Sequence, residues 1–229
     1  MSFPVALVLA IVESFLLGSI PFGVIVAKVG YGKDPRDGGS GSIGMTNMAR
    51  LFGVKAAAIT FVGDAGKGAL ALGIVRLMLP FVVGIDAQWQ IDLLLVAGVV
   101  AAIFGHVYCP WLGFKGGKGI STGFGSILVA FPLTVLCMLA VFLVVALATK
   151  RISAGSICAA IAFPLFSYVF TPGSVPVLVM STIVAAAVVY AHRGNIKRMV
   201  HGEEPKFSFH HDDAADAKET SYMKSRAKP

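Results

Sequence analysis

The sequence predicts an all-α integral membrane protein: a polytopic bundle of about seven transmembrane helices, with the N-terminus outside and the C-terminus in the cytoplasm. Three observations lead to this prediction. Of 229 residues, 56% are hydrophobic and only 14% are charged, whereas soluble domains carry about 25% charged residues. Apolar stretches of membrane-spanning length recur along the chain. Most basic residues fall in every second loop between these stretches.

The individual spans follow from their lengths, because a helix needs about 20 apolar residues to cross the hydrocarbon layer. Five stretches fit as single helices: 4–27, 54–79, 91–112, 155–171 and 175–191. The stretch 119–149 would be roughly 47 Å long as one helix, which is too long for one crossing. We expect it to form two short helices that turn near Phe131-Pro132, since proline ends or kinks a helix.

The basic residues indicate the orientation, because cytoplasmic loops are enriched in Lys and Arg. With seven spans and an outside N-terminus, the inner loops hold twelve basic residues: Lys28, Lys33, Arg36, Arg50, Lys55, Lys115, Lys118, Lys150, Arg151, Arg193, Lys197 and Arg198. The outer loops hold none, only Asp86 with Asp92 nearby. A single span over 119–149 would place Lys118 and Lys150 on opposite sides. Seven spans are therefore favoured over six.

The chain divides into a transmembrane domain over residues 1–201 and a polar tail over 202–229. The first part has fourteen Lys/Arg against six Asp/Glu, a net charge of +8, and the tail has five against six, a net charge of −1. The basic residues lie in twos and threes between apolar spans, so no nucleic-acid binding is expected. We expect the tail to be disordered and in part added for expression. Its run His210-His211-Asp212-Asp213 is expected to be solvated rather than a metal site.

The first inner loop has the composition of an anion-binding site. Its glycines match the spacing G-x-G-x-x-G, but a dinucleotide fingerprint needs a βαβ unit, and membrane helices flank this loop. Glycine allows successive N–H groups to point at one anion, and a guanidinium forms a forked contact with phosphate. The alternative is a flexible hairpin. The polar groups of this loop are Ser40, Ser42, Thr46, Asn47 and, one turn later, Arg50.

A second inner loop, residues 114–122, places Lys115 and Lys118 among three glycines at the start of a helix. The P-loop pattern G-x-x-x-x-G-K-[ST] does not fit, because its leading glycine and its closing hydroxyl residue are absent. Free N–H groups and the helix dipole would still add to the lysine charges at a phosphate. The alternative is that the lysines serve only the positive-inside bias.

Two more polar groups lie within or beside spans. Asp64 and Lys67, at i and i+3, lie about three turns into the second span. Ionisable groups at that depth pair with each other or line a polar cavity, so we expect an ion pair that is either structural or supports a site. His192 ends the last span, and Asn195 follows three residues later. No cluster of Asp, Glu and His faces the loops, so no metal or other cofactor is implied.

These motifs together resemble the bacterial glycerol-3-phosphate acyltransferases that use acyl phosphate as donor. The resemblance covers about residues 10–206, and Ser42 stands where the family usually has Asn. The motifs are Gly18-Ser19-Ile20-Pro21-Phe22-Gly23; residues 39–50, similar to GSGNxGxTNxxR; residues 64–68, similar to DxxKG; residues 105–119, similar to GHxxP…FKGGKG; and the patches 153–156 and 192–202.

The resemblance implies a membrane acyltransferase for the first step of phospholipid synthesis. A fatty acyl group would move from acyl phosphate to the 1-hydroxyl of sn-glycerol 3-phosphate, giving lysophosphatidate and phosphate. No cofactor is implied. The expected location is the bacterial cytoplasmic (inner) membrane, with the lipid bilayer and an upstream acyl-phosphate-producing enzyme as partners. The rival interpretation is a transporter of a phosphorylated anion, but no basic outer vestibule and no inverted repeat is apparent.

The resemblance also implies roles for individual residues. Lys118 and His192 are the expected catalytic residues: Lys118 would polarise or anchor the acyl phosphate, and His192 or a substrate phosphate oxygen would accept the hydroxyl proton. Asp64 and Lys67 form the expected ion pair. The expected substrate-binding residues are Ser40, Gly41, Thr46, Asn47, Arg50, Gly116, Gly117, Ser156 and Asn195.

Overall fold

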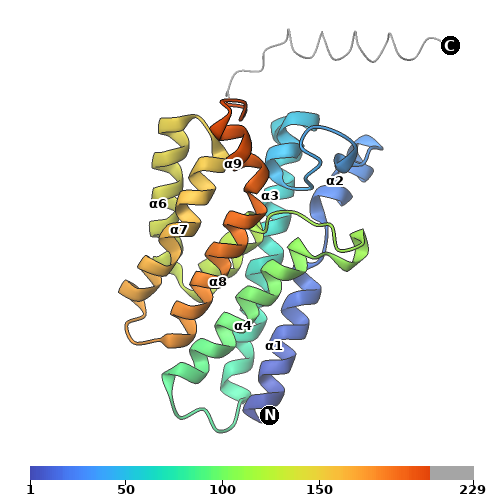
Figure 1. Cartoon of the computed structure of the whole chain (residues 1–229). Helices are drawn as coiled ribbons and strands as arrows, with labels where there is room; N and C mark the ends of the chain where they lie inside the picture. The colour runs from blue at the N-terminus through green and yellow to red at the C-terminus, as the bar shows by residue number, and fades with distance from the viewer. Residues whose placement is uncertain (207–229) are drawn as a thin grey trace, which may run out of the picture.

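A computed structural model of the chain describes residues 1–206, and its long elements are helices, as predicted. Figure 1 shows them running side by side, with the N-terminus at one end of the bundle and α9 at the other. The helices are α1 (Phe3–Gly18), α2 (Phe22–Tyr31), α3 (Met45–Met78), α4 (Gln88–Val107), α5 (Ile120–Ala130), α6 (Pro132–Thr149), α7 (Ile152–Phe170), α8 (Val175–Ala191) and α9 (Arg193–Val200). Short 3-10 turns lie at Pro35–Asp37, Leu79–Phe81 and Pro110–Leu112.

Within residues 1–206, five helical stretches are long and apolar enough to cross a membrane: Phe3–Tyr31, Met45–Phe81, Gln88–Leu112, Pro132–Thr149 and Ile152–Phe170. The pair α8 and α9, bent by 56°, adds a sixth if it forms one span. The expected break near Phe131-Pro132 is confirmed, because α5 ends at Ala130 and α6 begins at Pro132. With eleven residues, α5 extends only about 16 Å. A count of seven spans therefore requires α5 to be included.

The two ends of the bundle differ in charge. The α3–α4 and α7–α8 connections lie at the end that holds the N-terminus, and Asp86 is the charged residue of these connections (Figure 1). The glycine-rich loops and α9 lie toward the other end, with the basic residues. One arginine, Arg76, departs from this pattern in the last turn of α3. Its guanidinium donates to the carbonyl oxygens of Val129 and Ala130 at 2.7 and 2.8 Å, so it caps the end of α5.

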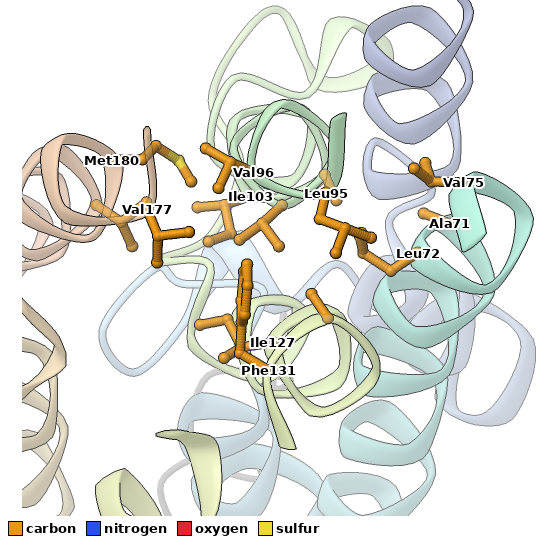
Figure 2. Close-up of a cluster of buried hydrophobic side chains, with 14 of the residues drawn as sticks. Ala71, Leu72, Val75, Leu95, Val96, Ile103, Ile127, Phe131, Val177 and Met180 are labelled. Carbon is orange, nitrogen blue, oxygen red and sulfur yellow. The ribbon is translucent and has the colours of Figure 1, made fainter. Parts of the chain in front are cut away.

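The hydrophobic core surrounds α4 (Figure 2). Side chains from three other helices converge on it: Leu72 from α3, Ile127 from α5 and Val177 from α8, each with an exposed fraction of 3% or less. Ile103 of α4 lies between them. The end of α4 is thereby fixed, and the loop that carries Lys118 starts from it.

The helices α3 and α5 pack especially closely, because glycines face the neighbouring backbone at their crossing. A Cβ atom at Gly68 would overlap the carbonyl oxygen of Thr122, and one at Gly125 would overlap that of Ala65. Between membrane helices such small residues permit the close van der Waals packing that replaces a hydrophobic driving force. The first inner loop leads into α3 and the second into α5. Their close packing therefore holds the two motif loops in a fixed relation.

Candidate active site

A cavity of about 580 Å³ lies between the inner loops and the helix bundle. Its lining changes in character from one part to the other. Polar side chains come from both glycine-rich loops and from the ends of the later helices: Ser40, Ser42, Thr46, Asn47, Arg50, Lys118, Ser153, Ser156, His192, Asn195 and Glu204. Apolar side chains come from within the bundle: Phe61, Ile103, Phe124, Ile127, Met138, Phe142, Phe163 and Val184. The cavity is amphiphilic and can hold a molecule with a polar head and an apolar tail.

A second, smaller cavity of about 260 Å³ adjoins this site. It shares Ser40, Lys118 and Asn195 with the larger cavity, and it adds Arg193 and Arg198 from α9. Unlike the larger cavity, it has no deep part lined by large apolar side chains. Lys118 and Asn195 therefore lie where two compartments meet, one amphiphilic and one basic.

Asn47 organises the first loop. Its Oδ1 accepts a hydrogen bond from the Ser40 N–H at 2.8 Å, and its Nδ2 donates to the carbonyl oxygens of Pro35 and Ser42 at 2.9 and 2.8 Å. A further bond from Nδ2 to Gly38 measures 3.3 Å. We expected Asn47 to contact substrate directly, but its amide is used to hold the loop in shape.

Arg50 lies one turn beyond this loop on α3. Its side chain is exposed at the cavity edge and has no hydrogen bond or ion pair within residues 1–206. Just after it, Gly53 has a φ of 81°, so α3 is broken there and its first turns are set at an angle to the rest. Ser40 and Thr46 line the same cavity, whereas Gly41 is exposed outside the lining. Within residues 1–206 the guanidinium is thus an unpaired cation at the edge of a cavity that two hydroxyl side chains also line.

Lys118 belongs to a hydrogen-bonded group that we call the mouth cluster: Lys118, Ser153, Asn195, Arg198 and Glu204. The Lys118 ammonium donates to Asn195 Oδ1, and Asn195 Nδ2 donates to Glu204 Oε1 at 2.6 Å. Ser153 Oγ donates to the same Glu204 oxygen at 2.5 Å, and Arg198 Nε donates to Oε2 at 2.7 Å. Glu204 is only 4% exposed. It therefore holds three donors, from α7 and α9, in one arrangement.

The environment of the mouth cluster changes the acidity of its charged groups. Burial lowers the pKa of Lys118 to about 8; the Glu204 charge opposes this, and the charges of Arg198 and Arg50 add to it. Burial alone would raise the pKa of Glu204, but the hydrogen bonds from Ser153, Asn195 and Arg198 outweigh it and hold that pKa below its usual value. Glu204 is therefore ionised at neutral pH, and Lys118 loses its proton near pH 8, just above neutrality.

His192 ends α8 with its ring buried against the cavity. Its Nδ1 lies 2.8 Å from the Val188 carbonyl oxygen. A carbonyl oxygen can only accept, so Nδ1 carries the proton, and in the neutral ring Nε2 presents a lone pair. The Ser156 hydroxyl also lines the cavity, and it donates to the Ile152 carbonyl oxygen at 3.1 Å. His192 is thus arranged to accept a proton through Nε2.

A second buried group, which we call the deep cluster, consists of Asp64, Lys67 and His106. The Lys67 ammonium lies 2.7 Å from Asp64 Oδ1, 2.9 Å from His106 Nδ1 and 2.6 Å from the Ile20 carbonyl oxygen. All three side chains are at most 4% exposed, and Asp64 and His106 line the cavity. The cluster joins α3, α4 and the break between α1 and α2. His106 lies within a recognised motif, but nothing in the spacing of that motif places it beside Lys67.

Gly116 and Gly117 do not contribute to the cavity lining. Their N–H groups donate to the carbonyl oxygens of Val107 and His106, at 3.0 and 3.2 Å. These bonds satisfy the end of α4 and fold the loop back on it. The two amides expected to contact substrate are therefore bonded within the protein, and Lys118 is the charged group of residues 114–122 that lines the cavity.

The sequence also missed three members of the mouth cluster. The expected domain boundary after residue 201 separated Glu204 from the site, although two adjacent acids, Glu203 and Glu204, just after a basic helix were the signal that could have suggested a partner for Arg198. Ser153 lay within a recognised patch without an assigned role. The rest of the expected tail, residues 207–229 with the His210-His211-Asp212-Asp213 run, lies outside the described residues. Within residues 1–206, no group of three or more His, Cys, Asp and Glu side chains is placed to hold a metal ion.

The fold and the cavity define a membrane protein whose amphiphilic site lies at one end of a helix bundle. The profile of the family described as glycerol-3-phosphate acyltransferase matches residues 8–202. A glycerol-3-phosphate acyltransferase of Geobacillus kaustophilus (strain HTA426) is 40% identical over 198 residues, covering 86% of this chain and 94% of the relative. That of Bacillus subtilis (strain 168) is 39% identical, covering 86% and 96%.

Solved structures agree with these relatives. The crystal structure of PlsY (YgiH), described as an integral membrane glycerol 3-phosphate acyltransferase in its glycerol 3-phosphate form, has a TM-score of 0.78 and 35% sequence identity to this chain. The match covers 88% of this chain and 96% of that one. The chain belongs to the glycerol-3-phosphate acyltransferase family. It is a membrane-integral acyltransferase of lipid biosynthesis, and the transporter interpretation is not favoured.

Proposed function

We propose that the enzyme transfers a fatty acyl group from acyl phosphate to the 1-hydroxyl of sn-glycerol 3-phosphate. The hydroxyl oxygen forms a bond to the acyl carbon, the bond from that carbon to the phosphate oxygen breaks, and lysophosphatidate and inorganic phosphate result. An acyl phosphate is a mixed anhydride with a good leaving group, so no covalent acyl-enzyme is needed. Positioning and charge stabilisation can supply most of the rate.

The amphiphilic cavity is the observation that carries this proposal. Its apolar depth suits an alkyl chain, since each buried methylene contributes about 0.8 kcal/mol. Its polar part contains Lys118 and Arg50, which suit phosphate groups. The adjoining basic compartment with Arg193 and Arg198 gives a water-soluble phosphate ester a route to the polar part of the larger cavity, next to the acyl donor. Two phosphate-bearing substrates thus meet at Lys118.

We assign roles on this basis. Arg50, with the hydroxyls of Ser40 and Thr46, binds the phosphate of glycerol 3-phosphate, and Asn195 and Ser156 complete that pocket. Lys118 stabilises the charge that builds up on the acyl phosphate. The proton of the attacking hydroxyl passes either to His192 Nε2 or to a substrate phosphate oxygen. Asn47 and the glycines at positions 41, 116 and 117 act by shaping the two loops rather than by touching substrate.

The proposed setting is the cytoplasmic face of a bacterial inner membrane. We count seven crossings, with α5 as a short one that is completed by the Phe131-Pro132 turn. The concentration of basic residues around α9 and the glycine-rich loops supports an inside location for that end. An enzyme that makes acyl phosphate would act upstream and deliver an amphiphile to the membrane.

Single-cysteine labelling tests this orientation. In a background with the three native cysteines replaced, cysteines at Asp34, Lys115 and Ile152 should be protected from an impermeant reagent added outside intact cells. A cysteine at Asp86 should react. External labelling at Ile152 would contradict the inside placement of the α6–α7 connection.

A direct assay tests the reaction. Enzyme purified in detergent is supplied with long-chain acyl phosphate and glycerol 3-phosphate, and lysophosphatidate is measured by mass spectrometry together with released phosphate. The two products should appear in equal amounts. Acyl-coenzyme A, which offers the same chain on a thioester without an acyl-bound phosphate, serves as the alternative donor. Lysophosphatidate formed from the thioester but not from acyl phosphate would refute the proposed donor while leaving the family assignment intact.

A further inference from the structure

We propose that His106 is a further catalytic residue: its Nε2–H, in a neutral ring, donates a hydrogen bond to the acyl carbonyl oxygen of the bound donor. This inference rests on the proposed placement of the acyl donor in the amphiphilic cavity. It concerns the deep cluster, none of whose side chains has a role in the reaction as proposed.

The first step is the protonation state of the ring. An ammonium group has three protons, and the Lys67 nitrogen has three close partners: the Ile20 carbonyl oxygen at 2.6 Å, Asp64 Oδ1 at 2.7 Å and His106 Nδ1 at 2.9 Å. Nδ1 therefore accepts a proton from Lys67, because a proton on Nδ1 would oppose the ammonium. Asp64 Oδ1 lies 3.5 Å from Nδ1, too far for a competing strong bond. The ring proton is on Nε2.

The second step is the direction of that proton. Within residues 1–206, Nε2 has no hydrogen-bond partner, and it is not one of the unpaired polar atoms that the protein seals from solvent. His106 lines the amphiphilic cavity. Gly117 packs against the ring on one side, where a Cβ atom would overlap Nε2. Nε2 is therefore a free donor that borders both the cavity and the loop carrying Lys118.

The third step is the depth of His106 in the cavity. One turn before it on α4 is Ile103, and one turn before Asp64 on α3 is Phe61; both are apolar lining residues. Beyond His106, on the other side, is Lys118. The ring thus lies at the boundary between the polar and the apolar lining. In an acyl phosphate the carbonyl group lies between the phosphate and the alkyl chain, so this boundary is where it would come to rest.

A neutral donor at this point suits the chemistry. When the hydroxyl oxygen bonds to the acyl carbon, the carbonyl electron pair moves onto oxygen, and a pre-positioned N–H stabilises the negative charge. The charge returns to the carbonyl as the phosphate leaves, and His106 keeps its proton throughout. The Asp64 charge does not oppose this, because it is paired with Lys67. The buried ion pair fixes which nitrogen of His106 carries the proton.

Two substitutions separate hydrogen bonding from packing. In His106→Gln, the amide oxygen can accept from Lys67 while the amide nitrogen donates into the cavity, which reproduces both functions of the ring. In His106→Leu, a side chain of comparable bulk offers neither. His201→Leu is the matched control, because His201 is an exposed histidine that bonds to the Lys197 carbonyl oxygen and does not line the cavity.

Steady-state kinetics give the first measurement. His106→Leu should lower kcat by about 100-fold, the usual effect of losing one donor to a developing oxyanion, with the KM for glycerol 3-phosphate within about threefold of the parent. His106→Gln should recover kcat to within about tenfold, and His201→Leu should match the parent. Equal loss in the Gln and Leu variants would show that the ring only packs, and would overturn the proposal.

An infrared measurement on the bound carbonyl gives the second. The probe is a long-chain β-ketophosphonate with a ¹³C-labelled carbonyl, an unreactive isostere of acyl phosphate. Its carbonyl band should lie at lower frequency in the parent and in His106→Gln than in His106→Leu, since a hydrogen bond weakens the C=O bond. A parent band at the frequency of the unbound probe in an aprotic solvent would refute the proposal, even if the Leu variant fails to fold.

A failure of acyl phosphate as the acyl donor can be distinguished from a failure of the role proposed for His106. If the parent enzyme does not use acyl phosphate, the proposed function is wrong, and the same variants are then compared with the acyl donor that the parent does use. Every acyl donor has a carbonyl group, so a kcat loss in His106→Leu with rescue in His106→Gln would still support the role of His106. Unaltered kcat in His106→Leu with that donor would refute it.

Discussion

The mouth cluster and the deep cluster contain the same kinds of group, a lysine, a carboxylate and a neutral hydrogen-bonding side chain, yet they are used differently. In the deep cluster all three protons of Lys67 have partners at 2.9 Å or less. In the mouth cluster Lys118 has one partner within residues 1–206, Asn195, and the carboxylate of Glu204 is occupied by other donors. A saturated ammonium fixes structure, whereas an unsaturated one at a cavity is free to bind an anion.

The largest expected effect comes from breaking the deep cluster. Lys67→Met leaves the Asp64 carboxylate buried without its cation and should lower the free energy of unfolding by about 3–5 kcal/mol. Denaturation of the purified protein in mixed micelles measures it. Lys115→Met, at an exposed lysine, is the control and should change stability little. The double variant Asp64→Leu/Lys67→Met should regain part of the loss; a double variant no more stable than the single one would contradict the pairing argument.

Removing the lysine of the mouth cluster should affect rate rather than stability. Lys118→Ala is expected to lower kcat at least about 100-fold, or roughly 3 kcal/mol, because it removes a positioned donor from a developing charge. The thermal midpoint should stay close to that of the parent, since Glu204 keeps its bonds to Ser153, Asn195 and Arg198. Lys115→Ala, three residues earlier in the same loop, is the matched control. Normal turnover in Lys118→Ala would indicate that the lysines of this loop serve only the positive-inside bias that orients the protein in the membrane.

A smaller effect is expected at Arg50, at the edge of the amphiphilic cavity. Arg50→Ala should raise the apparent KM for glycerol 3-phosphate by about 10-fold or more, as expected for a lost charge-assisted contact to phosphate. Asn195→Ala should act in the same direction, while the KM for acyl phosphate changes much less. Arg50→Lys should restore little, because an ammonium does not reproduce the forked geometry. If the KM for acyl phosphate rises alone, the phosphate sites of Arg50 and Lys118 must be exchanged.

The smallest effect concerns pH. A lysine with a pKa of about 8 is charged below that pH and neutral above it. If the ammonium is the active form, kcat/KM should fall by about tenfold per pH unit above that value. In Lys118→Arg the side chain stays charged at these pH values, so the fall should disappear, whatever the absolute rate. An alkaline fall of equal position and slope in both enzymes would assign it to another group.

Local sequence signals predicted the elements of the fold and much of the site. Apolar length and the proline at position 132 predicted the helices and the break between α5 and α6. Ser40, Thr46, Arg50, Lys118, Ser156, His192 and Asn195 were all expected at a site, and all line the amphiphilic cavity. These predictions succeed because length, helix breaking and residue type are properties of short stretches of chain.

The amides of Gly116 and Gly117 and the side chain of Asn47 could not be assigned in this way. Whether a donor is free for substrate depends on which acceptor the fold brings to it. The Val107 and His106 carbonyls occupy the two glycine amides, and the carbonyl oxygens of Pro35 and Ser42 occupy Asn47. Motif spacing contains no information about these partners.

The sequence by itself determined that the helices are apolar enough to cross a lipid bilayer, which loops carry the basic residues, and which residue types are available to bind phosphate. Tertiary structure alone decided how those residues are connected. It brought Glu204 to Lys118 through Asn195, although 86 residues separate the two ends of that link, and it placed His106 beside Lys67 across 39 residues of chain. The physical reason is that composition and hydropathy act on each segment separately, whereas a hydrogen bond between distant segments exists only once packing has set their distance and direction.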